Sequence, residues 1–142
     1  MANKLQKTYE FKASTENVWD ALINPTIIKQ YFLGTDAISD WKEGSPILYK
    51  AIWEGQTFEN KGNILKLIPE KLLIVNYWTP FSGKPDSPEN YIVYSYELFK
   101  TDLGTKLTLT QDAVFESEER LDESWKNWDT ILNGLKEIVE NN

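Results

Sequence analysis

The 142-residue sequence contains no cysteine and no histidine. Without cysteine the chain has no disulfides, thiolate metal sites or cysteine nucleophiles, and it fits a reducing compartment. Histidine is the usual general base near neutral pH and the commonest metal ligand, so its absence excludes serine–histidine triads and the usual zinc or non-haem iron centres. Catalysis would depend on a carboxylate, a lysine or a tyrosine. We therefore favour a non-enzymatic function and expect no cofactor or metal.

Long apolar runs and an excess of basic residues are also absent. No stretch approaches the roughly 20 apolar residues of a membrane span, and the initial MANKLQKTYEF lacks the apolar run of a signal peptide. The 22 acidic residues outnumber the 15 basic ones, and the net charge of −7 opposes contact with nucleic-acid phosphates and anionic lipids. We expect a cytoplasmic protein that binds neither nucleic acid nor membranes. Neutral small molecules and proteins with basic patches remain as partners.

The first third of the chain predicts one strand and two short helices. Apolar and polar residues alternate over residues 5–11, which is typical of a strand. Ser14 or Thr15 then offers a side-chain oxygen to cap a short helix. Asn24-Pro25 ends that helix and starts another, since proline is tolerated in a first helical turn. Gly34 is expected to end the second helix.

The middle of the chain reads as consecutive strands with short connections. We predict them over residues 47–53, 58–68, 72–78, 91–99 and 105–113, with a weaker strand over 35–41. Such a series favours an antiparallel meander over parallel strands with crossovers. The exception is 79–90, whose core PFSGKPDSPE holds three prolines and a glycine. We interpret it as a flap near one end of the sheet, because loops of this length are often functional.

The last segment changes to a helical period. Apolar residues recur every three or four positions from Leu121 to Val139, which predicts an amphipathic helix about 30 Å long. Five acidic residues crowd its beginning, between Glu116 and Glu123. Negative charge there suits the helix dipole, and a solvated helix start is favoured over a metal-binding or protein-binding patch. Because the length also suits one core, we expect a single domain over residues 1–142.

This order of elements resembles the helix-grip fold of the START/Bet v 1-like superfamily (SRPBCC). Four local matches carry the resemblance: ASTENVWDALINP at 13–25, GNILKLIPEKLLIVNYW at 62–78, GTKLTLTQDA at 104–113, and the tryptophan and leucine seven positions apart at 128–135. Together they are similar to the branch named for the activator of Hsp90 ATPase, the AHSA1-like proteins. Asn127 stands where that branch is expected to have glycine. A lipocalin-like barrel, the rival fold, leaves no room for two early helices.

The resemblance implies an α+β helix-grip fold. A curved antiparallel sheet of six or seven strands would wrap around the long C-terminal helix, with the two short helices after the first strand. It also implies a hydrophobic cavity between sheet and helix. Members of the superfamily bind lipids, hormones, polyketides or other apolar ligands, and some act as cyclases or co-chaperones. The branch carries no shared catalytic set that transfers to this sequence, and one fold hosts many functions.

The candidate site consists of residues whose strand or helix phase turns them toward that cavity. They are Tyr49, Trp53, Tyr94, Tyr96, Leu109, Gln111, Trp128, Ile131, Leu132 and Leu135. They could line a pocket of a few hundred cubic ångströms that orients a ligand by hydroxyl and indole groups, or they could form a packed aromatic core. Gln111 falls in phase with two leucines, and its amide needs a partner in a ligand, a tyrosine or the backbone.

Two further groups have alternative interpretations. Trp41, Trp78 and Phe81 would form an apolar mouth or a dimer patch if they are exposed together, and ordinary core if they are not. Three carboxylates between residues 36 and 43 lack the spacing and the glycine of a calcium loop, so we discount a calcium site.

Three functions follow from these residues and from the resemblance. The leading hypothesis is a binding protein for a small apolar or aromatic molecule. The alternative is a co-chaperone-like interaction module whose partner is a chaperone or a second copy of the chain. An enzyme such as a cyclase or hydrolase acting in the same cavity is less favoured. It would need a tyrosine, carboxylate or lysine with a perturbed pKa aimed into the pocket.

Overall fold

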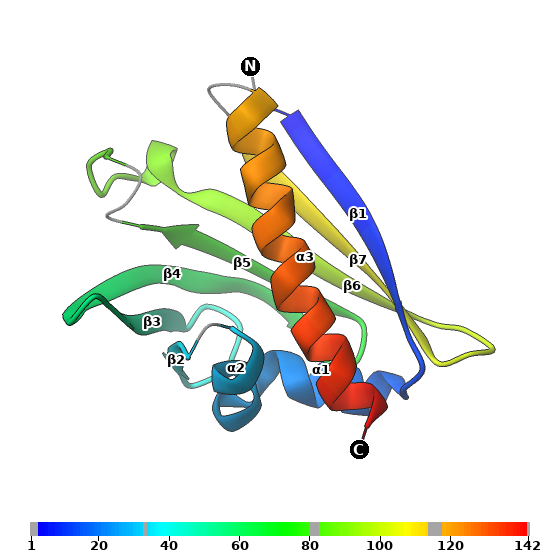
Figure 1. Ribbon diagram of the computed structural model, residues 1–142. Coiled ribbons are helices and arrows are strands. Elements are labelled where there is room, and N and C mark those ends of the chain that lie inside the picture. Colours follow the sequence, from blue (N-terminus) through cyan, green and yellow to red (C-terminus); the bar gives the residue numbers. More distant parts are fainter. Residues whose placement is uncertain (1–2, 33, 80–82, 114–117, 142) are drawn as a thin grey trace.

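The computed structural model describes residues 3–32, 34–79, 83–113 and 118–141. An antiparallel sheet packs against a long helix, and two short helices close one end (Figure 1). In chain order the elements are β1 (Asn3–Phe11), α1 (Thr15–Ile23), α2 (Pro25–Tyr31), β2 (Asp36–Ser39), β3 (Pro46–Trp53), β4 (Gln56–Ile68), β5 (Leu72–Trp78), the 3₁₀ turn η2 (Pro88–Asn90), β6 (Ile92–Lys100), β7 (Thr105–Ala113) and α3 (Glu118–Glu140).

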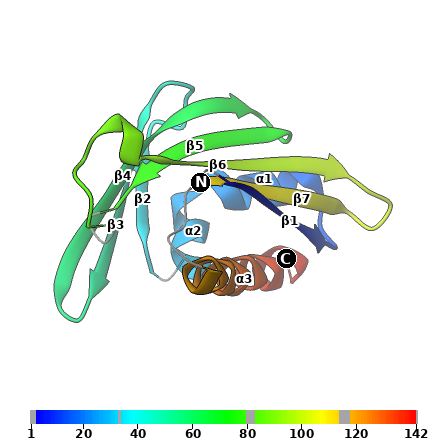
Figure 2. The ribbon, with the colours of Figure 1, turned by 90° about the horizontal axis from the view of Figure 1, so that it is seen from above.

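The sheet has seven strands in the described part of the chain, in the order β1-β7-β6-β5-β4-β3-β2. Strands β2 to β7 form a meander of sequence neighbours, and β1 joins the far edge beside β7. Every neighbouring pair is antiparallel. Figure 2 shows the sheet arching over α3, which lies on its concave side. The prediction of a curved antiparallel sheet of six or seven strands around a C-terminal helix is confirmed.

Two local features of β4 connect the sequence to the shape of the sheet. Glu54 and Gly55 have φ values of 50° and 77°, the left-handed pair that joins two strands in a tight hairpin. They connect β3 to β4, as this turn signal in the sequence indicated. Farther along β4 the register with β5 shifts between Ile64 and Lys66. A bulge of this kind bends the strand and increases its twist, and so contributes to the arch.

Both short helices have side-chain caps. The Asn17 backbone N–H donates to Ser14 Oγ over 3.1 Å, so Ser14, not Thr15, caps α1. The Thr26 N–H donates to Asn24 Oδ1 over 3.1 Å, and proline occupies the first turn of α2. This second helix ends at Tyr31, before the predicted stop at Gly34, which lies in the connection to β2 with φ of 74°.

Helix α3 spans 23 residues and crosses the concave face of the sheet along its whole length (Figure 1). The predicted apolar stripe is its buried side, formed by Trp128, Ile131, Leu132, Leu135 and Val139. The leucines at 107 and 109 of β7, both fully buried, belong to the same core. The core therefore lies between the middle of the sheet and the C-terminal two-thirds of α3.

The described part of the predicted flap, residues 83–90, is tied to its surroundings. Asp86 forms an ion pair with Lys61 of β4 and accepts a 2.6 Å hydrogen bond from the Tyr91 hydroxyl. The Asn90 amide donates to the Pro85 carbonyl over 2.9 Å, which closes the loop on itself. The indole N–H of Trp78 donates to the Lys84 carbonyl over 3.1 Å. This half of the loop is thus held against the end of the sheet in the structure.

Candidate functional site

Five aromatic side chains form a closed circuit of contacts between the sheet and α3. In order around the circuit they are Phe32, Tyr49, Tyr77, Tyr94 and Trp128, which we call the aromatic cluster. Successive ring centroids are 6.1, 6.4, 5.7 and 5.2 Å apart, and 6.1 Å separates Trp128 from Phe32. These spacings are those of direct aromatic contact. Three strands, one long helix and the end of α2 therefore meet at this cluster.

Strand alternation explains how the three tyrosines reach one another. Tyr49 is in phase with the buried Ile47 on β3, and Tyr77 is in phase with the buried Val75 on β5. Successive side chains of a strand point to opposite faces, so both rings stand on the concave face. Gly62 of β4 pairs with both Ile47 and Tyr77. Because position 62 contributes no side chain, the rings of β3 and β5 contact each other across β4.

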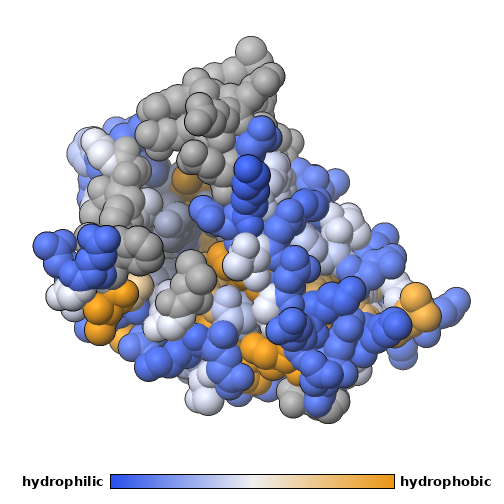
Figure 3. Space-filling view, viewed as in Figure 1, coloured by the Kyte–Doolittle hydropathy of each residue, from blue (hydrophilic) through white to orange (hydrophobic). Residues whose placement is uncertain are grey.

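The tyrosine hydroxyls of the cluster are kept neutral by burial. Desolvation is the main cause that raises the pKa of Tyr49, Tyr77 and Tyr94 above its ordinary value. The same three side chains nevertheless remain partly exposed. Side chains that are surrounded by protein and still reach solvent border a hollow. The space-filling view shows the surface hollowed beside α3, on the side of β3 to β5 (Figure 3).

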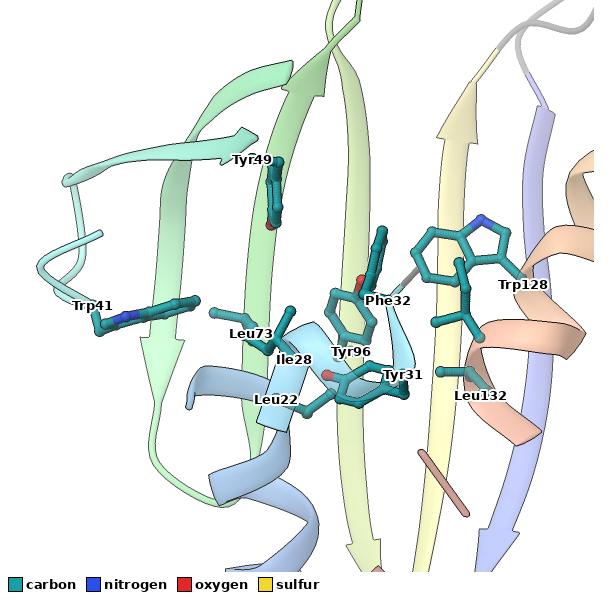
Figure 4. Close-up of a pocket in the computed structure, with 11 residues that line it drawn as sticks. Leu22, Ile28, Tyr31, Phe32, Trp41, Tyr49, Leu73, Tyr96, Trp128 and Leu132 are labelled. Carbon is teal, nitrogen blue, oxygen red and sulfur yellow. The ribbon is translucent and has the colours of Figure 1, made fainter. Parts of the chain in front are cut away.

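A small pocket lies inside this region, lined by aromatic and aliphatic side chains. Its volume is about 20 Å³, which is room for about one water molecule. Its aromatic lining includes Phe32, Tyr49 and Trp128, with Tyr31, Trp41 and Tyr96. Figure 4 shows Phe32 between Tyr49 and Trp128. The expected pocket of a few hundred cubic ångströms is therefore wrong for the conformation described. The large aromatic side chains fill the space themselves, as in the packed-core alternative.

Trp41 closes one side of the pocket from a strained backbone position. Its φ of 56° lies in the left-handed region, which is uncommon for a bulky residue. The Trp41 N–H donates to Ser39 Oγ over 3.1 Å, which holds this turn after β2. Its indole lies at the pocket opposite Trp128 (Figure 4). Strain of this kind persists only where the surroundings enforce it, and it is frequent at ligand-binding sites.

The structure brings most of the predicted site residues together. Tyr49, Tyr94 and Trp128 belong to the aromatic cluster, and the Tyr96 ring lies 6.2 Å from that of Trp128. Ile131 and Leu132 of α3 also line the pocket.

Three predicted site residues lie elsewhere in the interior. Leu109 and Leu135 are fully buried in the core and do not line the pocket. Gln111 is also fully buried, opposite Tyr94 in the register of β6 and β7. Trp53 is the last residue of β3, and its side chain lies outside the described part of the structure.

Sequence reasoning missed two members of the cluster. Tyr77 is in phase with Leu73 and Val75, so the alternation of β5 already contained the signal. Phe32 follows Ile28 by four positions and shares its side of α2, but it caps the helix, where the direction of a side chain depends on the tertiary fold. Of the predicted mouth, Trp41 lines the pocket, Trp78 anchors the 83–90 loop, and Phe81 lies outside the described residues.

A second group fastens α3 to the edge strand β1. Asp129 accepts hydrogen bonds from Lys7 Nζ at 2.6 Å and from the Tyr9 hydroxyl at 2.9 Å. The lysine ammonium also lies 5.7 and 5.8 Å from the ring centroids of Tyr9 and Trp125. These donors lower the pKa of Asp129, with the bond from Lys7 as the main cause. The group orients the N-terminal half of α3, where Trp128 points into the cluster.

The described residues show neither a metal-binding cluster nor a membrane-spanning helix. They contain no cluster of three or more carboxylates able to hold a metal ion. None of their helices is long and apolar enough to cross a membrane.

The model of the family described as activator of Hsp90 ATPase homolog 1-like protein (AHSA1) matches residues 12–140. The chain belongs to the AHSA1 family. Among solved structures, this AHSA1 chain is similar to ChR145 from Cytophaga hutchinsonii, with 43% identity over 98% of this chain and 94% of that one and a TM-score of 0.85. A comparison with curated proteins found no match.

Two more distant structures share the AHSA1 fold alone. SA2116 from Staphylococcus aureus, described as a protein of unknown function, is 16% identical over 99% of this chain and 95% of that one, with a TM-score of 0.83. The Aha1 dimer from Colwellia psychrerythraea is 21% identical over 97% of this chain and 96% of that one, with a TM-score of 0.76. The predicted branch of the superfamily is confirmed.

Proposed function

We propose that this AHSA1-family protein binds a small apolar or aromatic molecule at the aromatic cluster, between the sheet and α3. The closed circuit of five aromatic rings, three of which border a pocket of about 20 Å³, carries the proposal. Ligand sites are typically apolar concavities with a few placed polar groups, and three neutral tyrosine hydroxyls meet that description. We further infer that the chain acts as a single domain in the cytoplasm.

The first experiment is native mass spectrometry of protein purified from its own host under mild conditions. We expect a stoichiometric mass above that of the chain, which denaturation releases for identification. Tyr94→Leu removes a ring from the cluster and should lose the bound mass. Tyr91→Leu is the matched control, because Tyr91 lies by the 83–90 loop and outside the cluster; it should retain the mass.

A fluorescence titration covers ligands that are lost during purification. The sequence has six tryptophans, and Trp128 lies within the cluster, so an apolar aromatic compound bound there should change the emission. An apo mass together with no saturable response to a panel of neutral aromatic and aliphatic compounds would contradict the proposal.

The second candidate function is a co-chaperone-like interaction module, working through a chaperone or as a homodimer. The family description names the activator of Hsp90 ATPase, and one similar structure is an Aha1 dimer. This function needs no ligand in the cluster. It predicts that the purified protein raises the ATPase rate of the host's Hsp90, or is recovered with it in a pull-down, and that Tyr94→Leu leaves this activity unchanged. Light scattering tests the dimer.

A further inference from the structure

We propose that the ligand is a flat, uncharged aromatic molecule with one hydrogen-bond donor. It takes the place of the Phe32 ring in the aromatic cluster and donates to Oδ1 of Asn60. The inference rests on the proposed function and deepens it, because it names the class of ligand.

The Phe32 ring shows the shape of the space that the ligand would take. It stacks on Tyr49 with an interplanar angle of 19° and meets Trp128 edge-on at 86°. A position with one stacking partner and one perpendicular partner fits a planar aromatic ring, whereas a branched aliphatic group forms neither contact.

Phe32 also differs from the other four members in its support. Those four stand on strands of the sheet or on α3, while Phe32 caps the C-terminus of the seven-residue helix α2. Its side chain is only partly buried. Rotation of this ring breaks no bond of the sheet and leaves a flat space between Tyr49 and Trp128. Phe32 is thus the member that an incoming ring can displace at the lowest cost.

Asn60 supplies an acceptor beside Tyr49, the ring on which Phe32 stacks. It pairs directly with Tyr49 across β3 and β4, and directly paired residues project from the same face of a sheet. Its Oδ1 atom is buried and has no hydrogen-bond partner. A buried acceptor without a donor is unfavourable, so such groups require an explanation. A donor on the ligand would satisfy it.

The lining of the site requires an uncharged ligand. The side chains that line the pocket are aromatic or aliphatic, and none carries a charge. The tyrosine hydroxyls stay protonated because burial raises the pKa of Tyr49 and Tyr94. An ion placed among these groups would lose its hydration without gaining a counter-ion, which is strongly unfavourable.

Three compounds of one shape test the class of ligand by fluorescence titration at neutral pH. 2-Naphthol is neutral and has a donor, 2-naphthaldehyde is neutral and only accepts, and 2-naphthoate is an anion. We expect 2-naphthol to bind about three- to tenfold more tightly than the aldehyde, the difference that one hydrogen bond makes. We expect the naphthoate to bind at least about 100-fold more weakly than 2-naphthol.

Variants test the two residues separately. Asn60→Leu keeps the branched shape of the side chain and removes the acceptor. It should weaken the binding of 2-naphthol by about three- to tenfold and leave that of the aldehyde unchanged. Asn63→Leu is the matched control, because Asn63 is exposed on the opposite face of the same strand; it should change neither affinity. Phe32→Ala should raise the affinity for 2-naphthol about tenfold, because no ring has to be displaced.

The outcomes separate this inference from the proposed function. Equal affinities for 2-naphthol and the aldehyde, or an Asn60→Leu variant that binds 2-naphthol normally, would overturn the donor while aromatic binding stands. Tight naphthoate binding would overturn the uncharged class. Weaker binding of 2-naphthol by Phe32→Ala would show that the Phe32 ring contacts the ligand and is not displaced by it. If none of the three compounds binds to the wild type or to Phe32→Ala, the aromatic class fails here, and native mass spectrometry alone decides the proposed function.

Discussion

Gly62 of β4 lies so close to Asn76 of β5 that a Cβ at position 62 would come within 1.8 Å of the Asn76 carbonyl oxygen. The Asn63 N–H donates to Asn76 Oδ1 over 2.7 Å beside it, which holds the two strands in this close approach. Tyr77, the register partner of Gly62, is thereby placed against Tyr49 on the other side of β4. One glycine therefore determines the spacing of two cluster members.

Gly62→Ala should accordingly destabilise the protein by about 2 kcal/mol or more, because a methyl group there displaces backbone. Urea unfolding measures the change. Gly134→Ala is the control, since its Cβ would be 3.2 Å from the Tyr31 Cβ and the substitution raises helix propensity. We expect the control to stay within about 1 kcal/mol of the wild type. A Gly62→Ala protein as stable as the wild type would contradict the close approach.

Trp128→Ala should lower the free energy of unfolding by about 3–5 kcal/mol, because the indole is buried and contacts Phe32, Tyr94 and Tyr96. Chemical denaturation measures it. Trp78→Ala, at a partly exposed tryptophan by the 83–90 loop, should cost clearly less. Equal losses at the two sites would show that Trp128 does not anchor the helix to the sheet.

Asp129→Asn should weaken the link between β1 and α3. The pKa of Asp129 is lowered, first by Lys7, so its stabilisation is present above the ordinary carboxyl pKa and is lost as pH falls through the lower folded value. The Lys7 and Asp129 side chains are both about 40% exposed. We therefore expect the substitution to lower the free energy of unfolding by less than about 1 kcal/mol at neutral pH and to change nothing in acid. Unfolding curves at both pH values measure it, with Asp20→Asn on the exposed side of α1 as the control. A difference that persists in acid would rule out the ion pair as its cause.

The five core tyrosines, Tyr31, Tyr49, Tyr77, Tyr94 and Tyr96, should resist titration as long as the protein is folded. The pKa of all seven is raised, for most of them by desolvation. The unfolded chain ionises first, so stability is complete below the ordinary tyrosine pKa and falls as pH rises above it. We expect the tyrosinate absorbance of these five core residues and the loss of near-ultraviolet circular dichroism to appear together. If these tyrosines ionise while the protein is still folded, their hydroxyls are exposed to water and the prediction is wrong.

Asp86→Asn should loosen the 83–90 loop. The pKa of Asp86 is lowered by hydrogen bonds from Lys61 first and Tyr91 second, which join the loop to β4. Removal of the charge should increase amide hydrogen exchange in residues 84–90 and leave β6 unchanged. The wild type should show the same loss of protection in acid, relative to the intrinsic exchange rate at that pH, as Asp86 becomes protonated. Slow exchange that is unaffected by the substitution would mean that the internal bonds of Asn90 hold the loop by themselves.

Local patterns were sufficient for the elements and for the inward direction of most candidate residues. The alternation of β5 and β7 predicted both strands with their observed bounds, because strand side chains repeat every two residues on one buried face. The helical stripe predicted α3 and its buried face, although the helix begins at Glu118, before the first residue of the stripe. Tyr49, Tyr94 and Trp128 were predicted at the site for the same reason.

The sequence by itself determined the class of the fold and the inward-facing aromatics, since these depend on periodicity and local capping. The family followed from the resemblance carried by the four local sequence matches. Only the tertiary structure decided that the aromatics close into one circuit, that Phe32 completes it, and that the space left is about 20 Å³. Those features depend on how far β4 approaches β5 at Gly62 and on the angle at which α3 crosses the sheet. Both are distances between elements remote in the chain, and no local pattern encodes them.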